Sequence, residues 1–155
     1  MSTRRSFLIA LAGAPLIMTS LRAQAQLPAM TVHKDSNCGC CQTWAEQIAE
    51  AGFPIRVIEN SAMNRLKAQL GVPQRLASCH TAEIAGYVIE GHVPPAEVHR
   101  LLREKPRARG LAVPGMPVNS PGMEVPGAAE EAYDVVLFGG GADSVFARYS
   151  GARRT

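Results

Sequence analysis

The sequence contains no apolar run that is long enough to cross a membrane comfortably as a helix. The apolar stretch at residues 7–21 holds 15 residues and is interrupted by Gly13 and Pro15. A helical membrane span needs roughly 20 apolar residues. We therefore expect the mature protein to contain no membrane span.

Residues 1–25 instead have the three parts of a secretory signal peptide. Arg4 and Arg5 precede the apolar stretch, and Ala23-Gln24-Ala25 follows it, as a cleavage site requires. Paired arginines at this place resemble a twin-arginine export signal. We expect residues 1–25 to be removed on export to the periplasm, so that the mature protein begins at Gln26. The alternative is a retained membrane anchor.

An excess of charge is also missing once the expected signal peptide is removed. The full chain has 16 basic and 13 acidic residues. Arg4, Arg5 and Arg22 leave with the signal peptide, so 13 basic residues balance 13 acidic ones. A domain without net charge provides no electrostatic reason to bind nucleic acid or an anionic membrane.

Patterns of hydrolases and of phosphate-binding proteins are lacking too. The hydroxyl residues form no Ser-His-Asp arrangement. The three glycines at 139–141 are a weak match to a phosphate-binding loop, and they fall in an expected hairpin. These absences leave cysteine chemistry as the main functional signal.

The order of expected elements indicates an α/β fold. The expected strands are residues 30–34, 55–59, 84–90, 133–138 and 145–149, and the expected helices are residues 42–51, 62–70 and 94–105. We expect loops at 76–81 and 110–127 and a frayed tail from Gly151. Strand–helix–strand order favours parallel pairing. The arrangement predicts one domain over residues 26–155, a thioredoxin-like sandwich with a C-terminal β-hairpin.

Three of the four cysteines open the first expected helix, in the segment Cys38-Gly39-Cys40-Cys41. The positive end of a helix dipole can lower a thiol pKa and so favour the thiolate, which binds metals and acts as a nucleophile. The alternative is a set of buried or disulfide-linked cysteines. Cys40 and Cys41 are poor partners for each other because they are adjacent.

The donor types favour copper(I) as the metal. Clustered thiolates select copper(I), zinc or iron–sulfur clusters. A structural zinc site usually has two separated ligand pairs, whereas here the distant part is Cys79 followed by His80. Met116 and Met123, each in a proline–glycine loop, could add thioether ligands or could anchor the loop to the core.

The remaining histidines and the tryptophan allow two interpretations each. His80 could be a ligand or could hydrogen-bond to one. His92 could order the site or could bond backbone in a turn. His33 could point toward the cysteines or to solvent. Trp44 fits a core position better than a stacking platform.

Four separate motifs resemble one known protein family. They are Cys38-Gly39-Cys40-Cys41, Ser78-Cys79-His80-Thr81, residues 86–94 and residues 110–124. The family contains periplasmic metal-binding proteins, is catalogued as a domain of unknown function, and includes the CopG-type copper-resistance proteins. The resemblance extends over roughly residues 30–149. Asn119 departs from the family pattern, in which glycine is expected, but asparagine tolerates left-handed backbone.

This resemblance implies a thioredoxin-like fold, copper(I) held by Cys38, Cys40, Cys41 and Cys79, and a role in copper tolerance. Three hypotheses remain open. The first is a periplasmic protein that binds or sequesters copper(I), with copper ions and periplasmic copper-handling proteins as its partners. The second is a thiol–disulfide or copper oxidoreductase with Cys38 and Cys41 as catalytic residues. The third is an interaction module held by zinc or disulfides.

Overall fold

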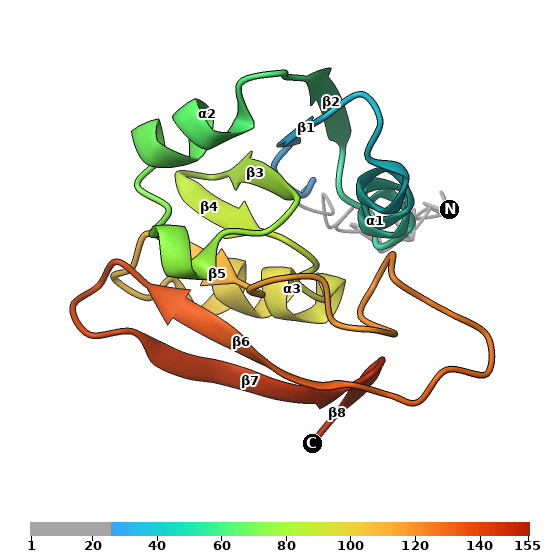
Figure 1. Ribbon diagram of the computed structural model, residues 1–155. Coiled ribbons are helices and arrows are strands. Elements are labelled where there is room, and N and C mark those ends of the chain that lie inside the picture. Colours follow the sequence, from blue (N-terminus) through green and yellow to red (C-terminus); the bar gives the residue numbers. More distant parts are fainter. Residues whose placement is uncertain (1–25) are drawn as a thin grey trace, which may run out of the picture.

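A mixed sheet of eight strands organises residues 26–155, the part of the chain that the computed structural model describes (Figure 1). The expected signal peptide, residues 1–25, lies outside the described residues. The strands are β1 (Met30–Lys34), β2 (Ile55–Glu59), β3 (His80–Ile84), β4 (Tyr87–Glu90), β5 (Gly110–Ala112), β6 (Ala132–Phe138), β7 (Ser144–Ser150) and β8 (Arg153–Arg154). The helices are α1 (Gly39–Glu50), α2 (Met63–Gln69) and α3 (Pro95–Glu104), with a 3-10 turn at Gln74–Leu76.

The predicted α/β class is confirmed. The strand order is β2-β1-β3-β4-β5-β6-β7-β8. As expected, β1 and β2 are parallel, with α1 as their connection, and β6 and β7 form the predicted C-terminal hairpin. Among residues 26–155, no helix is both long enough and apolar enough to span a membrane.

Three predicted segments were wrong. The single strand expected at residues 84–90 is a hairpin of β3 and β4, because the chain turns at Ala85 and Gly86, which have φ of 48° and 85°. The loop expected at 76–81 is consequently shorter, and His80 and Thr81 belong to β3. The tail expected to fray from Gly151 instead forms β8, which pairs with β7.

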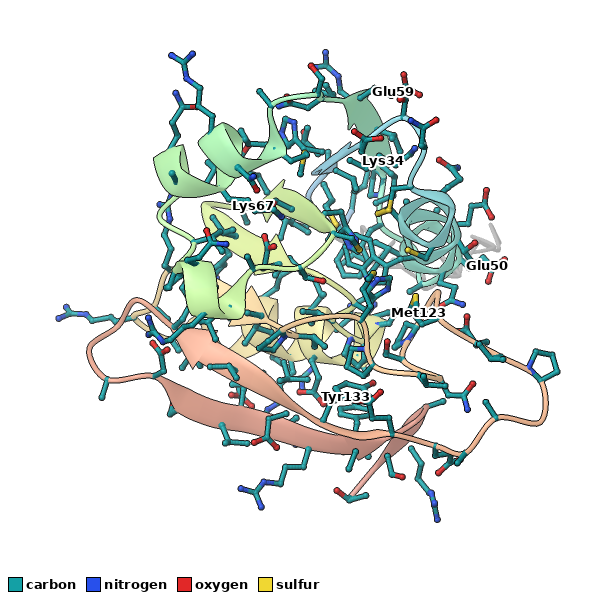
Figure 2. All side chains as sticks on the ribbon, viewed as in Figure 1. Lys34, Glu50, Glu59, Lys67, Met123 and Tyr133 are labelled. Atoms are coloured by element: carbon teal, nitrogen blue, oxygen red, sulfur yellow. A yellow bond between two sulfur atoms is a disulfide. The ribbon has the colours of Figure 1, made fainter. Side chains whose placement is uncertain are left out.

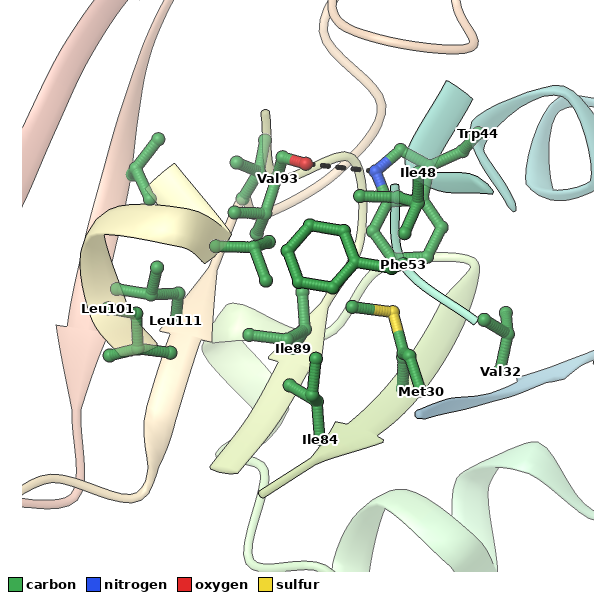
Figure 3. Packing of buried hydrophobic residues seen from close by; sticks show 14 of the residues in the cluster. Met30, Val32, Trp44, Ile48, Phe53, Ile84, Ile89, Val93, Leu101 and Leu111 are labelled. Carbon is green, nitrogen blue, oxygen red and sulfur yellow. Dashed lines mark hydrogen bonds between the residues drawn. The ribbon is translucent and has the colours of Figure 1, made fainter. Parts of the chain in front are cut away.

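The apolar core lies on both faces of the sheet. On one face, α1 and α3 pack through Trp44, Ile48, Val98 and Leu101 against strand residues such as Ile89 (Figure 3). A smaller cluster on the other face consists of Val72, Leu76, Val88, Ala112 and Phe138. Neighbouring residues in β4 join different clusters because successive side chains of a strand point to opposite faces.

The pairing of β1 with β3 positions the cysteines. These strands are antiparallel, and Lys34 at the end of β1 lies opposite His80 at the start of β3. The chain that leaves β1 toward α1 therefore runs beside the chain that enters β3. Cys38 and Cys79, 41 positions apart in the sequence, lie at this common edge.

Candidate metal centre

A tight turn places the first three cysteines at the start of α1. The Asp35 carboxylate accepts a hydrogen bond from the Asn37 N–H at 2.9 Å, and the Asp35 carbonyl accepts one from the Cys38 N–H at 3.1 Å. Cys38 is the N-cap residue of α1, and its side chain makes no capping hydrogen bond. The thiols therefore lie at the end of the helix where backbone N–H groups lack helical partners.

All four cysteine sulfurs come together. The ligand atoms of Cys38, Cys40, Cys41 and Cys79 lie within 4.8 Å of one another. Cys38 and Cys41 form a disulfide, whereas Cys40 and Cys79 are free. The Cys40 sulfur lies 3.6 Å from the Cys38 sulfur. The local disulfide thus uses two of the three clustered cysteines and leaves a free thiol in each of the two segments.

Two histidines approach the Cys79 sulfur, His80 at the start of β3 and His92 just after the end of β4. His80 Nδ1 lies 3.3 Å from it and His92 Nε2 lies 3.0 Å from it. His92 Nδ1 lies 2.8 Å from the Pro121 carbonyl oxygen, which can only accept, so Nδ1 carries the proton and Nε2 presents a lone pair to the sulfur. Cys79, His80 and His92 form a second group of potential ligands that shares Cys79 with the first.

Burial controls the protonation of this group. Burial, reinforced by the nearby Cys40, raises the pKa of the Cys79 thiol from 9.0 to about 12. Burial is also the main reason why the pKa of His80 lies well below 6.5 and why that of His92 is lowered. The metal-free site therefore holds a neutral thiol and neutral imidazoles. A bound cation would favour the thiolate instead.

Trp44 holds the base of the site. Its indole N–H donates a 2.9 Å hydrogen bond to the Val93 carbonyl, and its ring lies 4.3 Å from the His80 ring. Trp44 is fully buried, as expected of a core residue, but it also contacts a candidate ligand. His80 Nε2 has no hydrogen-bond partner among the residues described.

The proline–glycine loop packs against the start of α1. Gly122 has a φ of 84°, and a Cβ there would lie 2.8 Å from the Cys40 carbonyl oxygen. Met123 is therefore held near α1 (Figure 2). Asn119 has the left-handed conformation anticipated for it, with a φ of 63°. Its side-chain oxygen accepts a hydrogen bond from Val125 N–H at 2.8 Å, which stabilises the loop.

Met116 and His33, two further candidates from the sequence, lie nearer the surface. Met116 is 53% exposed, although the adjacent Gly115 accepts a hydrogen bond from the Ser78 hydroxyl. His33 Nε2 lies 3.3 Å from the Glu83 carboxylate, an interaction on the strand surface. His92 was not among the main ligand candidates predicted from the sequence. The one sequence feature that pointed to it was its position at the end of an expected strand.

Cys79 is also reachable from the surface. It lines an open cleft of about 490 Å³. The other lining residues are Asp35, Ser61, Ala62, Met63, Asn64, Arg65, Lys67 and Ser78. A metal ion or a small thiol could thus approach Cys79 from the side of α2.

Comparison with known proteins relates the chain to one sequence family and to two solved structures. Residues 76–123 match the family described as "Protein of unknown function, DUF411", a segment that contains Cys79, His80, His92 and Met116. No curated protein matches the chain. Two solved structures do, "Copper resistance protein copG- Form 2" and "Copper resistance protein copG- Form 1", each 44% identical with a TM-score of 0.75. The matches cover 79% and 81% of this chain, and 98% and 99% of those chains. The chain belongs to the CopG family of copper resistance proteins.

Proposed function

We propose that this protein binds copper(I) through Cys38, Cys40, Cys41 and Cys79 and contributes to copper tolerance in the periplasm. The carrying observation is that four sulfurs from two distant segments lie within 4.8 Å of one another. Thiolates are soft ligands that copper(I) prefers. The name of the CopG relatives supports copper as the metal.

Binding by all four sulfurs requires the Cys38–Cys41 disulfide to be reduced. A dithiol reductant would supply two electrons and two protons and would itself become a disulfide, and two thiols would form here. Each thiol then releases its proton as it binds the metal. The oxidised protein retains Cys40 and Cys79 as free thiols.

Further ligands are proposed from the same geometry. His80 Nδ1 lies 3.3 Å and His92 Nε2 lies 3.0 Å from the Cys79 sulfur, which supports a role for either nitrogen beside the thiolates. The loop that carries Met123 packs on α1, which supports Met123 as a thioether ligand. Met116 remains a candidate for an outer position because it is exposed beside the Cys79 segment.

Anaerobic metal titration of the reduced protein tests this function. We expect copper(I) to displace zinc(II) and Cys79→Ser to weaken copper(I) binding by at least about tenfold. His99→Asn is a suitable control, because His99 is partly buried but bonds the Ala51 carbonyl on the far end of α1. Retention of zinc with less than one copper per protein would instead indicate a structural zinc module.

A second candidate function is thiol–disulfide or copper oxidoreduction by Cys38 and Cys41. The specific observation in its favour is the disulfide between these residues at the start of α1. Cys40→Ser separates the two functions. It should leave an insulin-reducing enzyme active, whereas it should strongly weaken a binder that uses all four sulfurs.

Two further proposals concern architecture and location. The order β2-β1-β3-β4, with β1 parallel to β2 and antiparallel to β3, supports a thioredoxin-like unit extended by β5–β8. The composition of residues 1–25 supports export with a cleaved signal peptide and a mature domain at 26–155. N-terminal sequencing of the protein from the periplasm should give Gln26 as its first residue. A product that retains Arg4 and Arg5 would contradict this.

A further inference from the structure

A buried ion pair lies beneath the Cys79 segment. The Lys67 ammonium, from α2, lies 2.6 Å from Glu90 Oε1 at the end of β4. Glu90 is fully buried and Lys67 is 6% exposed. Lys67 also donates to the Thr81 hydroxyl at 2.8 Å, and this hydroxyl donates to Glu90 Oε2 at 2.7 Å. Figure 2 shows Lys67 on the side of α2 that faces the sheet.

The Glu90 carboxylate is bonded directly to the backbone before Cys79. The Ser78 N–H donates a 2.6 Å hydrogen bond to Glu90 Oε1, the same oxygen that contacts Lys67. Ser78 lies outside any helix or strand, between the 3-10 turn and β3. The Ser78 hydroxyl bonds the Gly115 carbonyl, whereas the Ser78 N–H bonds Glu90, so Glu90 anchors the backbone of the residue next to the thiol.

The two residues that follow β4, Gly91 and His92, also contact the Cys79 segment. A Cβ at Gly91 would lie 2.6 Å from the Ser78 Cβ, so only glycine permits this close approach. His92 Nε2 contacts the Cys79 sulfur at 3.0 Å. Three consecutive residues therefore contact the Cys79 segment in different ways: Glu90 bonds its backbone, Gly91 packs against it, and His92 contacts its thiol.

We propose that Glu90, with Lys67 as its counter-ion, is a positioning residue that holds the Cys79 segment in place for metal binding. This inference rests on the proposed function. Glu90 acts through the Ser78 N–H and does not itself contact the metal. The anchor is present before metal arrives, so the site is organised in the metal-free protein.

Stability alone is a poor explanation for this pair. Two buried charges lose their hydration, and apolar residues of similar size often give equal or greater stability. Here both oxygens of the Glu90 carboxylate accept hydrogen bonds, and one of these bonds comes from the segment that carries Cys79. The arrangement is therefore better explained by the geometry that it imposes there.

Two double variants distinguish the effect of the hydrogen bond to Ser78 from the effect of the buried charges. Lys67→Leu with Glu90→Gln removes both charges but retains an amide oxygen for the Ser78 N–H. Lys67→Leu with Glu90→Leu removes the acceptor as well. We expect the second variant to bind copper(I) about 10- to 100-fold more weakly than the wild type, the range found when residues that support metal ligands are replaced. The variant with glutamine should remain within a fewfold of the wild type.

The chain offers a matched control at another buried carboxylate. Glu97 is 2% exposed and bonds Tyr149 and Arg100, and among the described residues it makes no hydrogen bond to the Cys79 segment. Glu97→Gln should lower the unfolding midpoint without changing the copper(I) affinity. This control distinguishes a positioning effect from a general loss of stability.

A measurement on the wild type keeps the test independent of variant folding. In the metal-free, reduced protein, hydrogen exchange of the Ser78 amide should be protected; exchange at the rate of a free peptide would overturn the proposal. Equal copper(I) affinity of the leucine variant and the wild type would also overturn it. Neither result would affect the proposed function, which fails separately if Cys79→Ser binds copper(I) as the wild type does.

Discussion

Trp44 shows that one side chain can both pack in the core and contact a candidate metal ligand. Trp44 closes the core between α1 and β3, and its ring also packs on His80, whose Nδ1 faces the Cys79 sulfur. The indole N–H fixes the ring by bonding the Val93 carbonyl. Core packing at Trp44 therefore controls the orientation of a candidate ligand.

Replacement of Trp44 by Phe should reveal this double role. The change leaves the buried Val93 carbonyl without its donor and removes part of the surface that contacts His80, at a cost of about 2 kcal/mol in the free energy of unfolding. Urea unfolding of the metal-free protein measures this cost. Tyr87→Phe removes a more exposed bond to Pro106 and should cost about 1 kcal/mol or less. Equal effects of the two changes would contradict the assigned role of Trp44.

The burial of His80 predicts how stability depends on pH. Burial, followed by the effects of His92 and Lys67, holds the pKa of folded His80 well below the unfolded value of 6.5. Below that pH the unfolded state binds a proton that the folded state does not bind. The free energy of unfolding of the metal-free protein should therefore fall as the pH drops from about 6.5 toward 5.

Urea unfolding at several pH values in the presence of a chelator measures this dependence. His80→Gln removes the titrating group and should make the decline shallower. A wild-type stability that stays constant or rises over this interval would contradict the lowered pKa of His80.

At the level of elements, the loop between β5 and β6 acts as a cover for the start of α1. Gly122 fits between the Cys40 carbonyl and Trp44, and Glu124 accepts a 2.8 Å hydrogen bond from Gln47 on α1. These contacts hold an irregular segment against a helix without regular pairing. The loop is therefore sensitive to a single added methyl group.

Gly122→Ala should displace this loop. Gly127 provides a matched control, because both glycines have positive φ, 84° and 79°, but no atom lies within 4 Å of a Cβ at Gly127. Gly127→Ala should cost about 1 kcal/mol of unfolding free energy from backbone strain. Gly122→Ala should cost more and should also weaken copper(I) binding. Equal stability and equal affinity of the two variants would show that the loop does not depend on the close contact.

Elements with clear periodicity were predictable from the sequence. The bounds of β1 and β2 agree with prediction, and α3 begins at its paired prolines as expected. The β3–β4 turn was missed because residues 84–89 carry no charged side chain, and Ala85 adopts a positive φ that alanine rarely accepts. β8 was missed because its two residues, Arg153 and Arg154, are too few to show a strand pattern, although they pair with the adjacent β7.

At the scale of the whole molecule, sheet topology assembles the site from segments distant in sequence. The closeness of Cys79 to the first three cysteines was expected from the motif resemblance, and the structure explains it by the antiparallel register of β1 and β3. The Lys67–Glu90 pair was not predictable, because charged residues on a helix and at a strand end usually face solvent. Only the tertiary arrangement brings their charges together beneath Ser78.

The central claim is that one metal centre draws sulfur ligands from both segments. The most direct test is copper X-ray absorption spectroscopy of the reduced protein, loaded anaerobically with copper(I), compared with Cys79→Ser and with the His99→Asn control. We predict a sulfur-rich copper shell in the wild type and the control, and fewer sulfur ligands per copper in Cys79→Ser. Identical sulfur coordination in wild type and Cys79→Ser would contradict a shared centre.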